Sequence, residues 1–228
     1  MATMADETTQ GTADGGTVAG ADLPGVDLSG EPGRAAVTPP AVEEDLADLL
    51  GVAQSVAEES RSFLTTITEV GAGTNPEAAI PLLLLAVSDV LAVGARLGAI
   101  VDVVPPDRYE PDIGPDPDVD PLRVALANVL EGIDEYAEVV DPVLGAEVTG
   151  STLSGELVAI AGALVQGLRH HEQGQELEAL WWWQFSYLSS WGERASSVLR
   201  VLQVVLGHLR LDVEDDVAAE AEYDALQP

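Results

Sequence analysis

The sequence predicts an all-α fold, a single helical bundle of five to six helices with a long Pro/Asp-rich surface loop and disordered acidic tails. Three observations predict it. Apolar residues recur at helical spacing through most of residues 41–211, and no stretch reads convincingly as a strand. In addition, 46% of the 228 residues are hydrophobic while 4% are aromatic, so the core is aliphatic. We therefore expect one helical domain over residues 41–211.

The two ends of the chain differ from this central part. Residues 1–40 are rich in Gly, Thr, Ala, Asp and Pro and show no apolar period, which predicts a disordered acidic tail. Residues 212–228 carry seven acidic residues and no basic one, which predicts a second acidic tail. The whole chain holds 40 Asp and Glu against nine Arg, for a formal charge of −31. This charge repels phosphate groups, so we expect no direct binding to nucleic acid or to anionic membranes.

Three features favour a cytoplasmic protein. The chain has no Cys, and its N-terminus lacks the basic segment and apolar run of a secretory signal. The most apolar stretch, residues 78–101, is interrupted by Asp89 and Arg96. We therefore expect it to be a buried core helix and not a membrane span.

The first expected helix covers residues 42–70, with Gly51 as a weak point between two segments. The second begins at TNPE, where Asn75 can cap the helix and Pro76 can occupy its first turn, and continues to Ile100. Because this second helix is apolar on almost every side, we expect it at the centre of the bundle.

Residues 101–121 hold six Pro and seven acidic residues, which predicts a long extended loop over the surface. Asp120-Pro121 is expected to open a helix that continues to about Val140. A second loop is expected at residues 141–153.

The last two helices are expected at residues 154–172, with Gly174 as terminator, and at residues 176–211. The last helix carries WWWQFSYLSSWGE, which contains all four Trp of the chain. Trp182 falls on the polar side of this helix, where it either covers the base of the acidic loop or is an exposed anchor for a protein partner. The other aromatic side chains fall on the apolar face and are expected in the core: Trp181, Trp183, Phe185, Tyr187 and Trp191.

Four phrases of the sequence carry a family resemblance: RSFLTTITEV, IPLLLLAVSDVLAVGARLG, VVPPDRYEPDIGPDPDVDPLR and ALWWWQFSYLSSWGERASSVLR. Over about residues 55–212 the chain resembles the actinobacterial domain-of-unknown-function 5063 family. The resemblance implies a helical cytoplasmic protein with no established activity. Relatives are often encoded beside a recombination-mediator gene, which links the family to DNA recombination and repair by gene neighbourhood alone. Relatives carry His where this chain has Ser190 and Arg194, so His-based chemistry does not carry over.

Two groups of residues are candidate sites. Asp89 and Arg96 interrupt the most apolar helix, and buried charges are rarely left unpaired. Together with Arg194 they are expected to line a polar pocket, the best candidate for a small-molecule site.

The second group is Arg108-Tyr109-Glu110 in the middle of the Pro-rich loop. It is either a recognition element for a partner groove or a structural element, in which Tyr109 pins the loop to the bundle and Arg108 pairs with an acid.

The sequence predicts no metal site and no cofactor. His170 and His171 are adjacent, so their side chains point about 100° apart on a helix and cannot easily share a metal. DPDVDP, residues 116–121, starts like a calcium loop, but Pro121 and Ala127 stand where that loop needs Gly and Glu. No nucleotide-binding fingerprint or nucleophile elbow is found.

These observations favour a non-enzymatic protein-interaction module that binds a protein partner through residues 103–121, the surface near Trp182, or both. Two alternatives stay open: a carboxylate-based small-molecule or metal-dependent enzyme, and an acidic decoy that occupies the basic groove of a nucleic-acid-binding protein. The sequence sets neither the identity of the partner nor the oligomeric state.

Overall fold

The computed structural model describes the backbone of residues 40–105, 113–140, 143–145 and 147–211. All of them belong to the larger of two units, Pro39–Pro228, and the other unit is Met1–Thr38. The described chain is mostly helical with one small sheet, which confirms the predicted class. The two expected tails lie outside the described residues, except for the first residue of the first helix.

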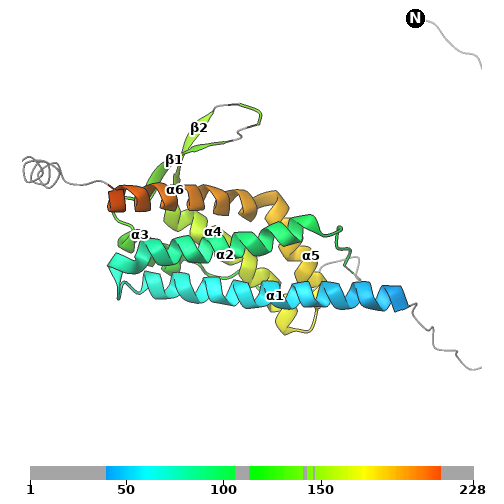
Figure 1. Ribbon diagram of the computed structural model, residues 1–228. Helices are drawn as coiled ribbons and strands as arrows, with labels where there is room; N and C mark the ends of the chain where they lie inside the picture. The colour runs from blue at the N-terminus through cyan, green and yellow to red at the C-terminus, as the bar shows by residue number, and fades with distance from the viewer. Residues whose placement is uncertain (1–39, 106–112, 141–142, 146, 212–228) are drawn as a thin grey trace, which may run out of the picture. The chain divides into compact units, whose positions relative to one another are not determined.

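The elements follow one another in this order along the chain (Figure 1): α1 (Pro40–Gly71), the short 3₁₀ helix η1 (Pro76–Ala78), α2 (Ala79–Ala99), α3 (Asp120–Val129), β1 (Glu135–Val139), β2 (Val148–Thr152), α4 (Leu153–Glu172), α5 (Glu176–Ser186), the π-helical turn η2 (Tyr187–Trp191) and α6 (Gly192–Leu211).

The first helix is continuous, so the weak point expected at Gly51 is wrong. A Cβ placed at Gly51 would meet nothing within 4 Å, so this residue lies on an open side of the helix. Buried residues continue on its other side through Ala53, Val56 and Phe63. Packing of this stripe against α2 outweighs the cost of about 1 kcal/mol that a mid-helix Gly carries.

The apolar pattern predicted α2 at the centre of the bundle, but α4 occupies that position. In Figure 1, α2 lies between α1 and α6, which it contacts along its length, and α4 lies behind them. Leu82 and Leu85 of α2 are exposed. In contrast, α4 contacts α1, α3, α5 and α6. The expected cap is also absent, because the side chain of Asn75 makes no capping hydrogen bond.

One described helical stretch, Pro76–Ala99, is long and apolar enough to cross a membrane by length and composition. In this fold it packs against α1, α5 and α6, and 44% of its most apolar window is buried inside the protein. In this structure the stretch is therefore a helix of the bundle, as predicted from the two charged residues that interrupt it.

Strands β1 and β2 form an antiparallel hairpin, although a helix to Val140 and a loop after it were expected. The helix α3 ends at Val129, and Gly132 follows with a φ of 89°, a left-handed conformation that favours glycine. β1 then pairs with β2, with Tyr136 opposite Ser151. Asp134 connects this hairpin to α4, since its carboxylate accepts hydrogen bonds from the backbone N–H and the hydroxyl of Ser154 at 2.7 and 2.8 Å.

The central helix α4 begins and ends close to the predicted residues. Thr152 caps its first turn by accepting a hydrogen bond from the Gly155 N–H at 3.2 Å. At the other end Gly174 has a φ of 74°, which confirms it as the terminator.

The last predicted helix is interrupted by the π turn, which separates α5 from α6. The interruption lies where aromatic rings pack over a glycine of α2: a Cβ at Gly94 would be 2.5 Å from Tyr187 and 2.6 Å from Trp191. Tyr187 and Trp191 also contact each other edge to face, with ring centres 4.8 Å apart. The turn therefore serves the close packing of α2 against the C-terminal helices.

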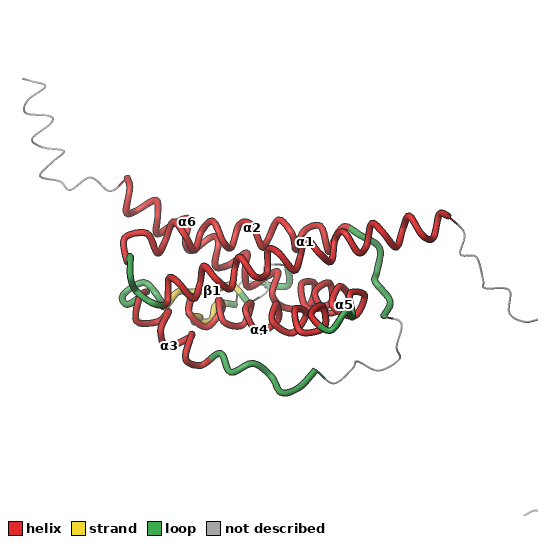
Figure 2. Tube along the Cα trace, turned by 90° about the horizontal axis from the view of Figure 1, so that it is seen from below, coloured by secondary structure: helices red, strands yellow, loops and turns green. Residues whose placement is uncertain are grey.

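The loop between α2 and α3 runs along the outside of the bundle (Figure 2), as predicted for the residues that are described. Gln184 of α5 fastens its first part. The Gln184 side chain accepts a hydrogen bond from the Val103 N–H at 2.8 Å and donates to the carbonyls of Leu97 and Val101 at 2.9 and 3.2 Å. Near the other end of the loop, the Arg169 side chain donates to the carbonyl of Pro115.

Candidate functional site

An apolar groove of about 430 Å³ lies beside Trp182, between α4, α5 and the end of the acidic loop. The side chains of α4 are small here, and those of α5 are large and aromatic, so the two helices leave open space between them. We call this cavity the Trp182 groove. Its lining consists of Asp116, Pro117, Val119, Val158, Ala159, Gly162, Ala163, Gln166, Trp182, Phe185, Ser186, Ser189 and Ser190.

Trp182 is half-buried and takes part in the fold. Its indole N–H donates to the carbonyl oxygen of Ala163 at 3.0 Å, which ties α5 to α4. It shares the groove with Asp116 and Pro117, so it lies at the base of the acidic loop, the first of the two positions predicted for it. Its role in partner binding stays a prediction. Because truncation to Ala would remove a contact of the fold, Trp182→Ala is a poor test of that role.

Phe185 is the exposed aromatic residue of the groove, with 52% of its surface accessible. Its ring stacks on Trp181 at a centroid distance of 5.6 Å. The prediction that Phe185 lies in the core is wrong, whereas Trp183 and Trp191 are buried as predicted. Trp181 and Tyr187 are half-buried against the core.

The serines of the groove add little polarity to it. The hydroxyls of Ser186 and Ser189 donate to the carbonyls of Trp182 and Phe185, both at 2.7 Å. Since these hydroxyls are bonded to their own helix, the groove keeps its apolar character.

A second cavity of about 380 Å³ adjoins this groove and shares Ser189 and Ser190 with it. We call it the polar cleft. It lies between the hairpin, α4 and α6. Its lining includes three Glu and one Arg, which give a net charge of −2. Its lining consists of Glu138, Val140, Thr149, Gly150, Ser151, Glu156, Ser189, Ser190, Glu193 and Arg194.

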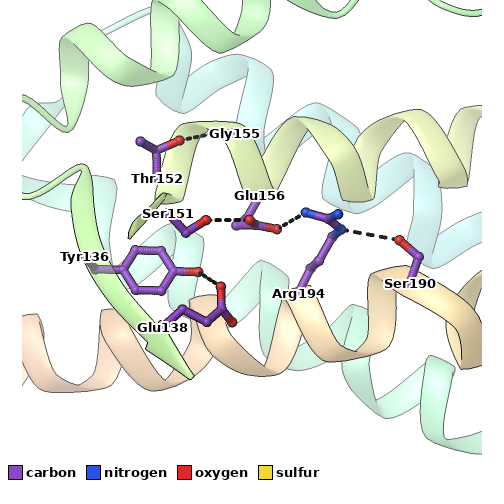
Figure 3. A network of polar contacts seen from close by, with 8 residues as sticks. All are labelled: Tyr136, Glu138, Ser151, Thr152, Gly155, Glu156, Ser190 and Arg194. Atoms are coloured by element: carbon purple, nitrogen blue, oxygen red, sulfur yellow. Dashed lines mark hydrogen bonds and ion pairs between the residues drawn. The ribbon is translucent and has the colours of Figure 1, made fainter. Parts of the chain in front are cut away.

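Glu156 organises this cleft, as Figure 3 shows. It is 7% exposed, and its two carboxylate oxygens accept hydrogen bonds from the Ser151 hydroxyl and from Arg194 Nη1, both at 2.6 Å. The Nε of Arg194 donates to the Ser190 hydroxyl at 3.3 Å. The guanidinium of Arg194 and the carboxylate of Glu156 therefore form an ion pair. Sequence reasoning identified Arg194 and missed Glu156, because an acid in the first turn of a helix is ordinary.

Tyr136 of β1 lies on the edge of this network. Its hydroxyl donates to Glu138 at 3.2 Å (Figure 3). Burial raises the pKa of Tyr136 to about 12, and the negative charges of Glu138 and Glu156 add to the effect. A phenol whose pKa is raised on folding contributes stability below its ordinary pKa of 10.0, and this contribution is lost as the pH rises from about 10 to about 12.

The three residues predicted to share a pocket do not do so. Asp89 and Arg96 are exposed on α2, so the expectation that they are buried is wrong. Arg96 lines a separate hollow between α1 and α2 with Asp48, while Arg194 lines the polar cleft. The apolar sequence of α2 was misleading, because one of its sides faces away from its neighbours.

The other predicted partner-binding residues, Arg108, Tyr109 and Glu110, lie outside the described residues.

Across residues 46–105, 113–140, 143–145 and 147–211, no group of three or more His, Asp and Glu is arranged to hold a metal ion. Ser151 donates to Glu156, whose other carboxylate oxygen is paired with Arg194. His170 lies 14 residues further along α4 from Glu156, about 21 Å along the helix axis.

The chain matches one protein-family model, described as a domain of unknown function (DUF5063), over residues 47–208. Among solved structures it is similar to the protein BF1032 from Bacteroides fragilis, with 13% identity and a TM-score of 0.52. This similarity covers 76% of the present chain and 97% of the other, and at such identity it reports the fold alone. Among curated proteins, none matches the chain.

Proposed function

The chain belongs to the DUF5063 family, and from the surface that this fold builds we propose that it is a non-enzymatic protein-interaction module of the cytoplasm. Its docking site is the Trp182 groove. Its partner is a protein with net positive charge that inserts an apolar side chain between α4 and α5.

The observation that carries this proposal is the groove itself. Ala159, Gly162 and Ala163 leave an apolar cavity, and Phe185 stands exposed at its side although aromatic residues are scarce in this chain. Exposed aromatic residues beside an apolar cavity are typical of the central contacts of protein interfaces.

Gln166 supports the same conclusion. It lines the groove, and its side-chain carbonyl oxygen is buried with no hydrogen-bond partner in the described structure. An unpaired buried acceptor costs about 1 to 3 kcal/mol. An N–H donor from a partner removes this cost if the amide turns towards the groove.

The sign of the partner's charge follows from that of the chain. A formal charge of −31 attracts basic proteins and repels acidic ones over about 8 Å at physiological ionic strength. The alternative of a carboxylate-based enzyme has less support, since Asp89 and Arg96 share no cavity with Arg194.

The proposal is tested by filling the groove. A Cβ at Gly162 meets nothing within 4 Å, so Gly162→Leu is expected to place its side chain in the groove without disturbing the helix. Gly207→Leu on α6 is the matched control, because Gly207 is equally open and lines none of the described cavities.

The full-length chain and both variants are used to capture proteins from the native host at low and high salt. We expect a basic partner that wild type and Gly207→Leu retain and Gly162→Leu loses. Equal capture by Gly162→Leu and wild type would contradict the proposal.

A further inference from the structure

We infer that the polar cleft is the subsite that selects the partner by its charge: it receives a Lys or Arg side chain of an extended segment whose apolar anchor occupies the Trp182 groove. This inference rests on the proposed function and adds the chemistry that the partner must carry next to its anchor.

The first argument is continuity. The groove and the cleft share Ser189 and Ser190, which lie on the π turn between α5 and α6. A chain that occupies the groove beside Phe185 therefore reaches the cleft without leaving the surface.

The second argument is charge. Arg194 is the basic residue of the cleft, and it is paired with Glu156 at 2.6 Å. Glu138 accepts a hydrogen bond from a neutral tyrosine, and the exposed carboxylate of Glu193 has no hydrogen bond or ion pair in the described part of the chain. Two carboxylates are thus left without a cationic partner in the cleft. A cation placed there is attracted by both of them.

The raised pKa of Tyr136 agrees with this view, since Glu138 and Glu156 both contribute to it. The nearest further cation on α6 is Arg200, which lines an adjacent hollow with Glu193 and forms no ion pair with it among the described residues.

The third argument is shape. The cleft is an open hollow of about 380 Å³ between the hairpin and α6. An extended segment can lie across it while one long side chain enters.

The spacing of the two recognised residues follows from the helix. Phe185 and Glu193 are eight residues apart, about 12 Å along the axis at the α-helical rise of 1.5 Å per residue and slightly less with the π turn between them. An extended chain advances about 3.3 Å per residue, so the Lys or Arg is expected three or four positions from the apolar anchor.

The test uses a library of random twelve-residue peptides displayed on phage and selected on the immobilised full-length protein. Clones that bind wild type and fail to bind Gly162→Leu are sequenced. We expect them to share an aromatic or Leu residue with Lys or Arg three or four positions away.

The enriched peptide is then synthesised with a fluorescent label, and its Kd is measured by anisotropy. Either change alone, the basic residue of the peptide to Ala or Glu193 to Gln, is expected to weaken binding about two- to fivefold at low salt. The two changes together are expected to cost little more than either alone, because they remove the same contact. Glu77→Gln is the control for net charge, since Glu77 is exposed on η1 and lines none of the described cavities.

The outcomes separate the two proposals. Groove-dependent peptides without a basic preference, or equal effects of Glu193→Gln and Glu77→Gln, would overturn the cation subsite and leave the docking groove standing. If no clone distinguishes wild type from Gly162→Leu, both proposals are overturned.

Discussion

Gly167 of α4 is the position where the fold is most sensitive to a single methyl group. A Cβ there would lie 2.1 Å from Nε1 of Trp183 and 2.3 Å from its Cε2. Carbon atoms in contact normally stay at least about 3.5 Å apart, so Gly167→Ala would force the indole to move by more than about 1 Å. Trp183 is fully buried, and its Nε1–H donates to the Leu164 carbonyl at 3.1 Å.

The expected cost has three parts. Overpacking a core costs about 1 to 3 kcal/mol, and loss of the indole hydrogen bond adds about 1 kcal/mol. Replacement of Gly by Ala in a helix returns about 1 kcal/mol. The net loss is about 1 to 3 kcal/mol, which for a chain of this size lowers Tm by about 2 to 12 °C.

Thermal and urea unfolding, followed by circular dichroism and Trp fluorescence, measure this loss. Gly162→Ala in the same helix is the control, because its Cβ meets nothing within 4 Å. We expect it to raise the free energy of unfolding by about 0.5 to 1 kcal/mol. A Gly167→Ala variant at least as stable as wild type would refute the reasoning, since Trp183 could then not be locked over Gly167.

Two further predictions concern the polar cleft. Arg194→Ala leaves the buried carboxylate of Glu156 with the hydrogen bond from Ser151. We expect the free energy of unfolding in urea to fall by about 1 to 2 kcal/mol, a moderate loss because Arg194 is 45% exposed and the ion pair is partly screened. An unchanged midpoint would show that Glu156 is solvated without Arg194. Tyr136→Phe removes a phenol whose pKa is raised to about 12, so absorbance titration of the folded protein should lose a phenol that ionises near pH 12, and the fall in stability between pH 10 and 12 should become shallower. Titration curves that coincide above pH 11 would contradict this.

The fold was predictable where the local preference of a residue and its tertiary packing favour the same structure. Gly174 ends α4 because a left-handed residue is needed there, and the Arg-His-His run before it already favours a helix end. The buried pair Trp183 and Trp191 followed from periodicity alone, since both fall on the apolar face of the helix.

The missed parts depend on tertiary contacts. The hairpin was predicted as helix and loop because the alternation of polar and apolar residues around Tyr136 is weak. The first strand forms by pairing with a segment that starts nine residues after it ends, and this pairing is not visible locally. Gly132 and the β-branched stretch at Val148 were the available signals.

The candidate site was only partly accessible from the sequence. Arg194 and Trp182 were both named, yet their partners Glu156 and Ala163 come from a different helix and carry no motif. The open side of α2 cannot be read from its sequence, because Leu85 is as apolar as its buried neighbours.

The π turn at residues 187–191 has a consequence for how the C-terminal helices tolerate insertions and deletions. Trp183, Tyr187, Trp191 and Ala195 face the core at three successive steps of four residues. On a regular helix each such step overshoots a full turn by about 40°, a drift of about 120° in total. The wider turn takes up this drift and sets the rotational phase of α6. Loss of one residue would let this turn close as a regular α-helix and would bring the drift back, so Val198 and Leu202 would turn away from their places in the core, and we expect chain length in this turn to be more restricted than residue identity.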